Sequence, residues 1–153
     1  MPWIPNPPKR SLKMSNVNTG RVVLGGLLAG LVLNIGEFVL NEIVLGSQMK
    51  TWFAAHNFKE PAGSFIAIAV VLTFVLGIVI VLTYALIRPR LGPGVKTAII
   101  AGLISWFAVY LYTGIINGVL FGLTMNQIVM PLVWGLVEYT LAAILGAWAY
   151  TEA

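Results

Sequence analysis

The chain contains no cysteine and a single histidine, and only 9% of its 153 residues are charged. Without cysteine there are no disulfides, no thiolate chemistry and no iron–sulfur ligands. One histidine, His56, excludes the histidine-rich metal centres of many membrane enzymes. Soluble domains carry roughly 25% charged residues. Together with a hydrophobic content of 59%, the scarcity of charge is typical of an integral membrane protein.

Catalytic motifs are also missing. The sequence has no Ser-His-Asp set, no HExxH, no paired aspartates for metal-bound phosphate and no Gly-rich phosphate loop. It therefore predicts a protein that is not an enzyme, with no cofactor and no metal site. The net charge of +4 does not indicate nucleic-acid binding, because the basic residues stand at the ends of hydrophobic runs, where they act as a topology signal.

Four hydrophobic runs are long enough for membrane helices, each of which needs about 20 apolar residues. The runs cover residues 19–46, 62–87, 97–123 and 128–150. We expect an all-α, four-helix transmembrane bundle that forms one domain over residues 19–153. Residues 1–18 hold four prolines and several basic residues, which favours either a disordered tail or an extended cytoplasmic arm on a partner or on the membrane surface.

The connection after the first run has its own pattern. Met49, Trp52, Phe53 and His56 follow the spacing i, i+3, i+4, i+7. This spacing predicts a short amphipathic helix in the membrane interface, where aromatic side chains lie at headgroup depth. A lone histidine in such a segment is more typical of a solvated residue than of a haem ligand.

The distribution of lysine and arginine predicts the orientation. With four spans, the N-terminal segment, the second connection and the C-terminus share one side of the membrane. That side holds seven basic residues: Lys9, Arg10, Lys13, Arg21, Arg88, Arg90 and Lys96. The other side holds Lys50 and Lys59. We therefore expect both termini in the cytoplasm and the bundle in the plasma (inner) membrane. The basic connection RPRLGPGVK enforces this topology, and contact with an anionic lipid is an additional role for it.

Polar and small residues concentrate on one face of the first span. Gly26, Gly30, Asn34, Glu37 and Asn41 fall within an arc of about 80° on a helix. A polar face at this depth is unfavourable against lipid, so it must face protein, water or a ligand.

The third and fourth spans repeat the pattern. Gly114, Gly118 and Gly122 form a doubled GxxxG beside Asn117, and the fourth span places Gly135, Glu138, Tyr139 and Gly146 on one face. Small residues at this spacing allow helices to pack closely. The second span has no charge or carboxamide and is expected to be either the most lipid-exposed helix or a purely structural one.

If the first, third and fourth spans pack through these faces, Glu37, Asn117 and Glu138 converge on one polar cluster, lined further by Asn34, Asn41 and Tyr139. No span contains a basic partner for either carboxyl group. Glu138 is therefore expected to be protonated or to share a hydrogen bond with Asn117, Glu37 or Tyr139.

Three roles for the cluster remain open from the sequence: hydrogen bonds that only hold helices together, a site for a proton, cation or small solute, and a pocket for a lipid, quinone or pigment. The absence of catalytic groups and the small-residue faces favour a non-catalytic accessory subunit of a larger membrane complex or oligomer, with other membrane subunits or a second copy as partners. The alternative is a small proton- or cation-linked transporter or channel that uses Glu37 and Glu138.

Overall fold

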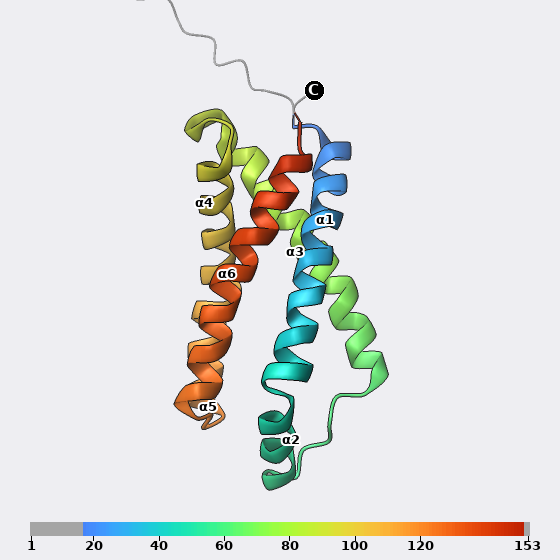
Figure 1. Ribbon diagram of the computed structural model, residues 1–153, viewed down its shortest axis with the longest axis vertical. Helices are drawn as coiled ribbons and strands as arrows, with labels where there is room; N and C mark the ends of the chain where they lie inside the picture. The colour runs from blue at the N-terminus through green and yellow to red at the C-terminus, as the bar shows by residue number, and fades with distance from the viewer. Residues whose placement is uncertain (1–16, 152–153) are drawn as a thin grey trace, which may run out of the picture.

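The computed structural model describes residues 17–151, and every regular element in that range is helical (Figure 1). Four helices are long and apolar enough to cross a membrane: Thr19–Val44, Gly63–Leu91, Val95–Leu120 and Met125–Ala149. Their number and order are those expected from the four hydrophobic runs. Most of the proline-rich segment 1–18 lies outside the described residues.

Two of the four spans are composite. The first consists of α1 (Thr19–Phe38) and a π-helical segment, η1 (Val39–Val44); the third consists of α4 (Val95–Trp106), the π-helical η2 (Phe107–Tyr112) and α5 (Thr113–Leu120). The second and fourth spans are α3 (Gly63–Leu91) and α6 (Met125–Ala149). A short helix, α2 (Gly46–Ala55), follows the first span.

The helix boundaries differ from the expected ones by a few residues, most at the second span. Helix α3 runs to Leu91, past the expected end at residue 87, with Pro89 in its last turn. Only residues 92–94 remain as a turn, and Gly92 and Gly94 have φ values of 85° and 121°, which favour glycine. Helix α6 begins at Met125 because Thr124, the residue before it, forms a capping box with Gln127 in the first turn.

The bundle has a closed end and an open end. Helix α1 packs against α3 and α6, and α6 also packs against α4. In Figure 1, α1 and α6 lie close together where α1 begins and α6 ends, and they separate toward the opposite end. We call the end where α1 begins and α6 ends the terminal end, and the opposite end, where α1 and α6 are apart, the far end.

Glycines bring the helices into backbone contact near the terminal end. A Cβ atom added at Gly25 would lie 2.4 Å from the carbonyl oxygen of Gly146, and one at Gly77 would lie 2.4 Å from that of Gly26. The surrounding core contains several alanines that are almost inaccessible, such as Ala29 and Ala142. Such close approach is the usual means of helix association in membranes.

The glycine face of α1 has a different partner from the one expected. Cβ atoms at Gly26 and Gly30 would clash with Ile78 and Phe74 of α3, so this part of the face packs against the second span. The small residue that accepts it, Gly77, lies in the span that looked merely structural. The expectation that the face meets the third and fourth spans is therefore corrected for these two glycines.

The amphipathic segment after the first span forms the helix α2, which extends beyond the other helices at the far end (Figure 1). Aromatic residues within this helix and just after it contact one another. The Trp52 ring stacks on His56 with centroids 4.4 Å apart and on Phe58 at 5.5 Å, and it meets Phe53 edge to face. Residues 46–48 extend the helix before the expected first position, Met49.

Candidate functional site: a pair of carboxyl groups between two spans

Glu37 lies in the last turn of α1 and its carboxylate is held by two donors. The Tyr110 hydroxyl donates to Oε1 at 2.6 Å, and Asn41 Nδ2 donates to Oε2 at 2.9 Å. Asn41 is one turn further along the chain, whereas Tyr110 belongs to η2 in the third span. Hydrogen bonds to a charged acceptor are the stronger kind, so the Glu37–Tyr110 bond ties two spans together.

Glu138 is the second carboxyl group, and it is more deeply buried. Its side chain is 6% exposed, and neither carboxyl oxygen has a hydrogen-bond partner. The Trp134 indole, one turn earlier on α6, acts on this carboxyl group but at a geometry short of a hydrogen bond. A buried polar group without a partner is costly, so this position calls for a reason other than stability.

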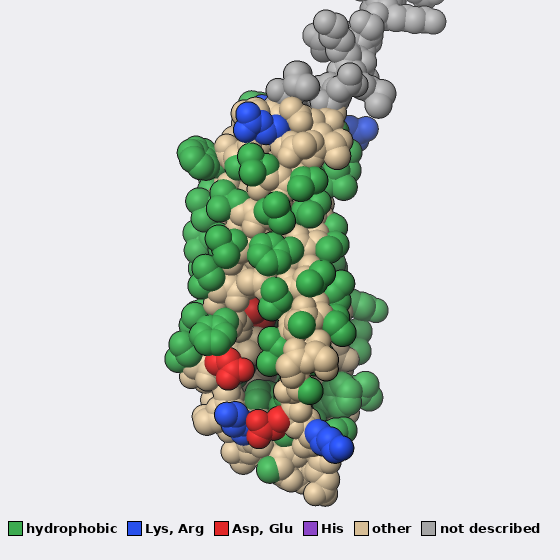
Figure 2. All heavy atoms as spheres, turned by 90° about the vertical axis from the view of Figure 1, so that its right-hand side faces the viewer, with side chains coloured by type: hydrophobic (Ala, Val, Ile, Leu, Met, Phe, Trp, Pro, Cys, Tyr) green, Lys and Arg blue, Asp and Glu red, His purple; other side chains and the backbone are tan. Residues whose placement is uncertain are grey.

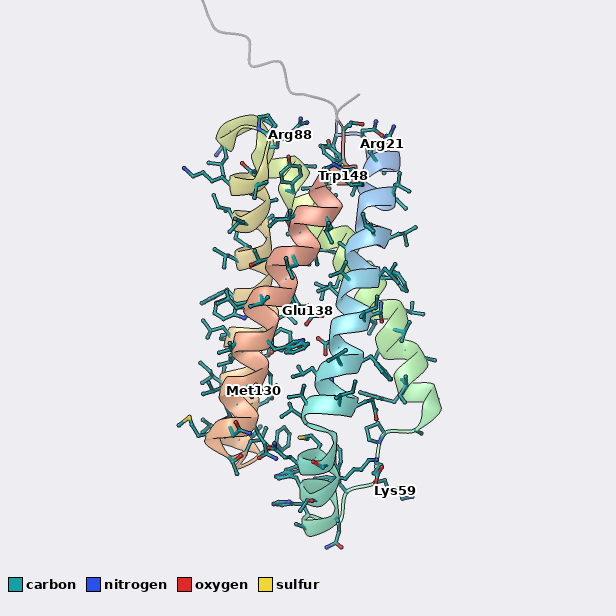
Figure 3. The ribbon with its side chains drawn as sticks, viewed as in Figure 1. Arg21, Lys59, Arg88, Met130, Glu138 and Trp148 are labelled. Atoms are coloured by element: carbon teal, nitrogen blue, oxygen red, sulfur yellow. The ribbon has the colours of Figure 1, made fainter. Side chains whose placement is uncertain are left out.

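Glu138 points from α6 toward α1 (Figure 3). Its carboxyl group packs directly on Gly36, where an added Cβ atom would lie 2.4 Å from Oε1. Glycine at position 36 thus provides the space that the carboxyl group occupies. Since Gly36 precedes Glu37, the Glu138 carboxyl group of α6 meets α1 one residue away from Glu37, and the two groups interact electrostatically.

Tyr110 connects the Glu37 carboxyl group to α6. Its ring packs on Gly135, where an added Cβ atom would lie 2.7 Å from a ring carbon. The ring also meets Tyr139 edge to face, with centroids 5.4 Å apart. Edge-to-face pairs of this kind are favourable beyond the area that they bury, so Tyr110 is fixed by α6 while its hydroxyl reaches α1.

Both π-helical segments adjoin this hydrogen bond. Glu37 lies two residues before η1, and Tyr110 lies within η2. A π-helix inserts an extra residue into the helical repeat and is frequent at functional sites. Here the two segments lie on either side of one interhelical contact.

A cavity of about 280 Å³ opens beside Glu37 toward the far end. Its polar lining residues are Glu37, Tyr110, Thr113, Asn117 and Gln127. The rest of the wall is apolar and comes from η2, α5 and the first two turns of α6. Near its far side, Asn126 donates to Gln48 of α2 at 3.1 Å, which links the start of α6 to the short helix.

The structure assembles part of the expected polar cluster. Glu37, Glu138 and Tyr139 lie together, and Asn41 bonds to Glu37. Asn117 lines the cavity that also includes Glu37, but its side chain is exposed.

Asn34 does not belong to the cluster. Its amide donates to the carbonyl oxygens of Gly30 at 2.8 Å and Val70 at 3.5 Å, which turns it toward α3. Its expected place beside the carboxyl groups is therefore corrected.

The predicted packing glycines fall into two groups. Cβ atoms at Gly118, Gly135 and Gly146 would meet neighbours at 2.6, 2.7 and 2.5 Å, so these positions are in close contact. Gly114 has only an ordinary contact at 3.4 Å, with Leu132. Gly122 lies beyond the end of α5 with φ +62° and nothing near it, so it serves the turn and its expected packing role is corrected.

Sequence reasoning missed Tyr110 and Gly36. Tyr110 stands four residues before Gly114 and seven before Asn117, and this spacing places it on the same helical face. That signal was available. Gly36 carried none, because its importance comes entirely from the side chain that α6 places against it.

The fold and the site define a helical bundle with four membrane-length spans and a carboxyl pair between the first, third and fourth. No group of three or more metal-binding side chains occurs in residues 17–151. The chain matches no protein-family model, no curated protein and no solved structure. Function must therefore be argued from the geometry.

Proposed function

We propose that the chain is an integral membrane protein with its terminal end in the cytoplasm. Figure 2 shows a band of hydrophobic side chains between charged groups at the two ends of the molecule. Such a band suits the hydrocarbon core of a bilayer, which is about 30 Å thick. The helices are otherwise thinly packed, with at most 33% of a span's most apolar window buried, so lipid is the natural cover for the remainder.

The described basic residues support this orientation. Arg21 and Arg88 lie near the terminal end and Lys59 near the far end (Figure 3). Arg90 is in the last turn of α3 and Lys96 in the first turn of α4, both at the terminal end, and Lys50 is in α2 at the far end. The excess at the terminal end favours the cytoplasmic side of a plasma membrane. Helix α2, with its aromatic cluster around Trp52, then lies at the outer interface, where such residues are favoured.

For the activity, we propose a small proton- or cation-linked transporter in which Glu37 and Glu138 bind the coupling ion. The observation that carries this proposal is the Glu138 carboxyl group, which is buried and makes no hydrogen bond of good geometry, although the Trp134 indole acts on it. At 1.5 Å per residue it lies about 20 Å from the start of α6, which is near the middle of that span. Ionisable groups at such depth typically mark ion or proton pathways.

The unequal surroundings of the two groups suggest how they share charge. Glu37 accepts hydrogen bonds from Tyr110 and Asn41, so each of its oxygens already has a donor. Glu138 makes no hydrogen bond of good geometry and interacts electrostatically with Glu37. Two neighbouring anions without a counter-charge are unfavourable inside a membrane, so the pair is suited to hold one proton or one small cation at Glu138. The cavity beside Glu37 offers a route from the far end.

Proton flux in liposomes tests this proposal. We expect the reconstituted protein to acidify or alkalinise vesicles loaded with a pH-sensitive dye when a pH or cation gradient is applied. Glu138→Gln should abolish the flux, and Glu37→Gln should reduce it at least tenfold. Glu42→Gln is the matched control, because Glu42 is an exposed carboxyl group on the same span. Flux that survives Glu138→Gln, or that falls equally with Glu42→Gln, would refute the proposal.

A second candidate is an accessory subunit in a larger membrane assembly, and Tyr112 favours it. This residue lies in η2, its side chain is 61% exposed, and no hydrogen bond of its hydroxyl is seen. At about 12 Å from the end of the span, the hydroxyl would face lipid unless a neighbouring protein supplied an acceptor.

Native mass measurement after gentle solubilisation tests this second candidate. The subunit proposal expects a fixed ratio of this chain to itself or to another chain, and it expects Tyr112→Phe to weaken the assembly. A chain that is found only as a monomer without other proteins would refute this second candidate.

A further inference from the structure

The cavity beside Glu37 contains polar groups that the carboxyl pair does not use. Two carboxamide side chains, Asn117 of α5 and Gln127 of α6, line it together with Glu37. The donors to the Glu37 carboxyl group are Tyr110 and Asn41, and neither carboxamide of the cavity wall is among them. We call this space the Glu37 cavity. Its two carboxamides are therefore available to a ligand.

Gln127 presents a hydrogen-bond donor to the Glu37 cavity. Its side chain is only 8% exposed. Its Oε1 accepts hydrogen bonds from the Thr124 N–H and the Thr124 hydroxyl, both at 2.9 Å, and these bonds distinguish the oxygen of the amide from the nitrogen. Nε2 has no hydrogen-bond partner among residues 17–151, and it is not enclosed by protein as the Glu138 oxygens are. Since Gln127 lines the cavity, its two N–H donors are left for an acceptor inside it.

Glu37 and Gln127 lie at opposite ends of the cavity. The Tyr110 hydroxyl that donates to Glu37 belongs to a ring that packs on Gly135 of α6. From Gly135 back to Gln127 is eight residues of α6, which is about 12 Å at 1.5 Å per residue. One end of the cavity is therefore acidic, and the other carries a carboxamide donor.

Asn117 belongs to the carboxamide end. The residue after it, Gly118, would place an added Cβ atom 2.6 Å from the side chain of Ile128, which is the residue after Gln127. Helix α5 and the first turns of α6 accordingly lie side by side at the far end (Figure 1). The Asn117 side chain makes no hydrogen bond within residues 17–151. It adds a second donor and an acceptor at this end.

Glu37 determines the charge of the ligand. It is the only carboxyl group that lines the cavity, and no lysine or arginine lines it. A carboxylate offers about four acceptor sites, and Tyr110 and Asn41 occupy two of them. A positively charged donor can therefore still bind Glu37. An anion would meet charge without compensation, and an apolar occupant would leave the carboxyl group and the carboxamides desolvated.

The size and the middle of the cavity suit a short alkyl chain. Its volume of about 280 Å³ corresponds to about nine water-sized groups at about 30 Å³ each. Pro131 and Leu132 lie between Gln127 and Gly135 on α6, and they line the wall there. A separation of about 12 Å, less a hydrogen bond of about 2.9 Å at each end, leaves about 6 Å between the two polar groups of a ligand.

We propose that the Glu37 cavity binds a small primary amine with an oxygen acceptor at the other end of a short alkyl chain, of which aminobutanol is a simple example. The ammonium group binds Glu37, and the oxygen accepts from Gln127 and Asn117. This inference rests on the proposed function in one respect, because it makes the amine the solute that is transported against the coupling ion at Glu138. Binding itself requires no transport.

Calorimetric titration of the purified full-length chain in dodecyl maltoside tests the binding. The probes are aminobutanol with its two groups at opposite chain ends, butylamine, butanediol and hydroxybutyrate. We expect one aminobutanol per chain. Butylamine, which lacks the acceptor, should bind at least fivefold more weakly, the effect of one hydrogen bond. Butanediol and hydroxybutyrate, which lack the cation, should bind at least tenfold more weakly.

Variants locate the two ends of the ligand. Glu37→Gln should weaken binding of both amines at least tenfold. Gln127→Met should weaken aminobutanol about fivefold and leave butylamine unchanged, and Asn117→Leu should act in the same direction without touching the capping box of α6. The matched controls are Glu42→Gln and Asn126→Leu, which replace a carboxyl group and a carboxamide outside the cavity. Circular dichroism verifies that each variant is folded.

The outcomes separate this inference from the transport proposal. Proton flux that depends on Glu138, with no binding of aminobutanol, would overturn the amine site and keep the transporter. Binding that depends on Glu37 and Gln127, with no flux, would keep the site and overturn the transporter. Butanediol that binds as tightly as aminobutanol would assign the cavity to a neutral solute, and an equal loss in Asn126→Leu would remove the role of Gln127.

Discussion

The two ends of the bundle are built on different principles. Near the terminal end, α1, α3 and α6 meet through glycines and alanines, and Gly25 faces Gly146 with almost no side chain between the backbones. Toward the far end, the Tyr110 ring and the two carboxyl groups lie between α1 and α6, and a cavity opens beside Glu37 along η2, α5 and α6. One end is closed by backbone contact, and the other is separated by polar and aromatic side chains.

This difference bears on what each half contributes to stability. Membrane helices associate by packing and hydrogen bonds, because lipid tails are as apolar as the side chains. The glycine contacts supply that packing near the terminal end, whereas the far half contains π-helical backbone and a buried carboxyl group that makes no hydrogen bond of good geometry. Sites that must bind or move are drawn from the less stable parts of a structure. We therefore expect substitutions to have opposite consequences in the two halves.

The largest effect is expected at Gly77 of α3. A Cβ atom there would lie 2.4 Å from both Gly26 O and Gly30 N, which are backbone atoms that cannot rotate away. Gly77→Val should lower the free energy of unfolding by about 3 kcal/mol or more. Unfolding in mixed micelles with increasing dodecyl sulfate, followed by circular dichroism, measures this.

Gly63→Val is the control for that substitution. Gly63 begins the same helix and has nothing within 4 Å of an added Cβ atom. Its replacement should change the free energy of unfolding by less than about 0.5 kcal/mol, as at most exposed positions. Equal losses in the two variants would show that the glycine contacts do not carry the stability of the terminal half.

Glu138→Met should have the opposite sign in the far half. Methionine has a similar length, and it removes a buried group whose oxygens have no partner. We expect a gain of about 1 to 2 kcal/mol in the free energy of unfolding, together with loss of proton flux. The same unfolding titration and the liposome assay measure the two quantities. A variant that is less stable would mean that the carboxyl group holds the helices together and that its role is structural.

Tyr110→Phe tests the one hydrogen bond that joins Glu37 to the third span. Hydrogen bonds between membrane helices contribute about 0.6 kcal/mol on average and up to about 1.7. We expect a loss of about 1 kcal/mol, within this range, because the bond is short at 2.6 Å. Tyr112→Phe, in the same π-helical segment, should leave the unfolding of the single chain unchanged. If both variants behave alike, the bond to Glu37 is not formed in the membrane.

How far the sequence predicts this architecture depends on the kind of signal. The four spans follow from run length and composition, because a run of about 20 apolar residues indicates a membrane-spanning helix. Helix α2 follows from the periodicity of Trp52 and its neighbours. The extension of α3 through Pro89 was not predicted, because a proline in a basic segment resembles a turn more than a last helical turn.

The candidate site was predicted only in part. Glu37 and Glu138 stand out as carboxyl groups in apolar runs, and the structure places them in neighbouring positions. The π-helical segments leave no mark in the sequence, yet they adjoin the contact between Glu37 and Tyr110. Asn34 was misplaced because a helical face spanning 80° meets two neighbours in a bundle, and periodicity alone does not say which residue faces which.

The smallest effect is expected from Gly114→Ala. Its comparison with Gly102→Ala contrasts the two halves of the third span. An added Cβ atom at Gly114 in α5 would meet only the end of the Leu132 side chain at 3.4 Å, whereas at Gly102 in α4 it would lie 2.8 Å from the Tyr139 carbonyl oxygen. Alanine is the better helix former by about 0.5 to 1 kcal/mol. Gly114→Ala should therefore be neutral or stabilising by up to about 0.5 kcal/mol, and Gly102→Ala should be destabilising despite the same gain in helix propensity. The unfolding titration compares them directly. A loss at Gly114 as large as at Gly102 would mean that α5 meets α6 at Gly114 as closely as α4 meets α6 at Gly102, which would contradict the looser contact at Gly114.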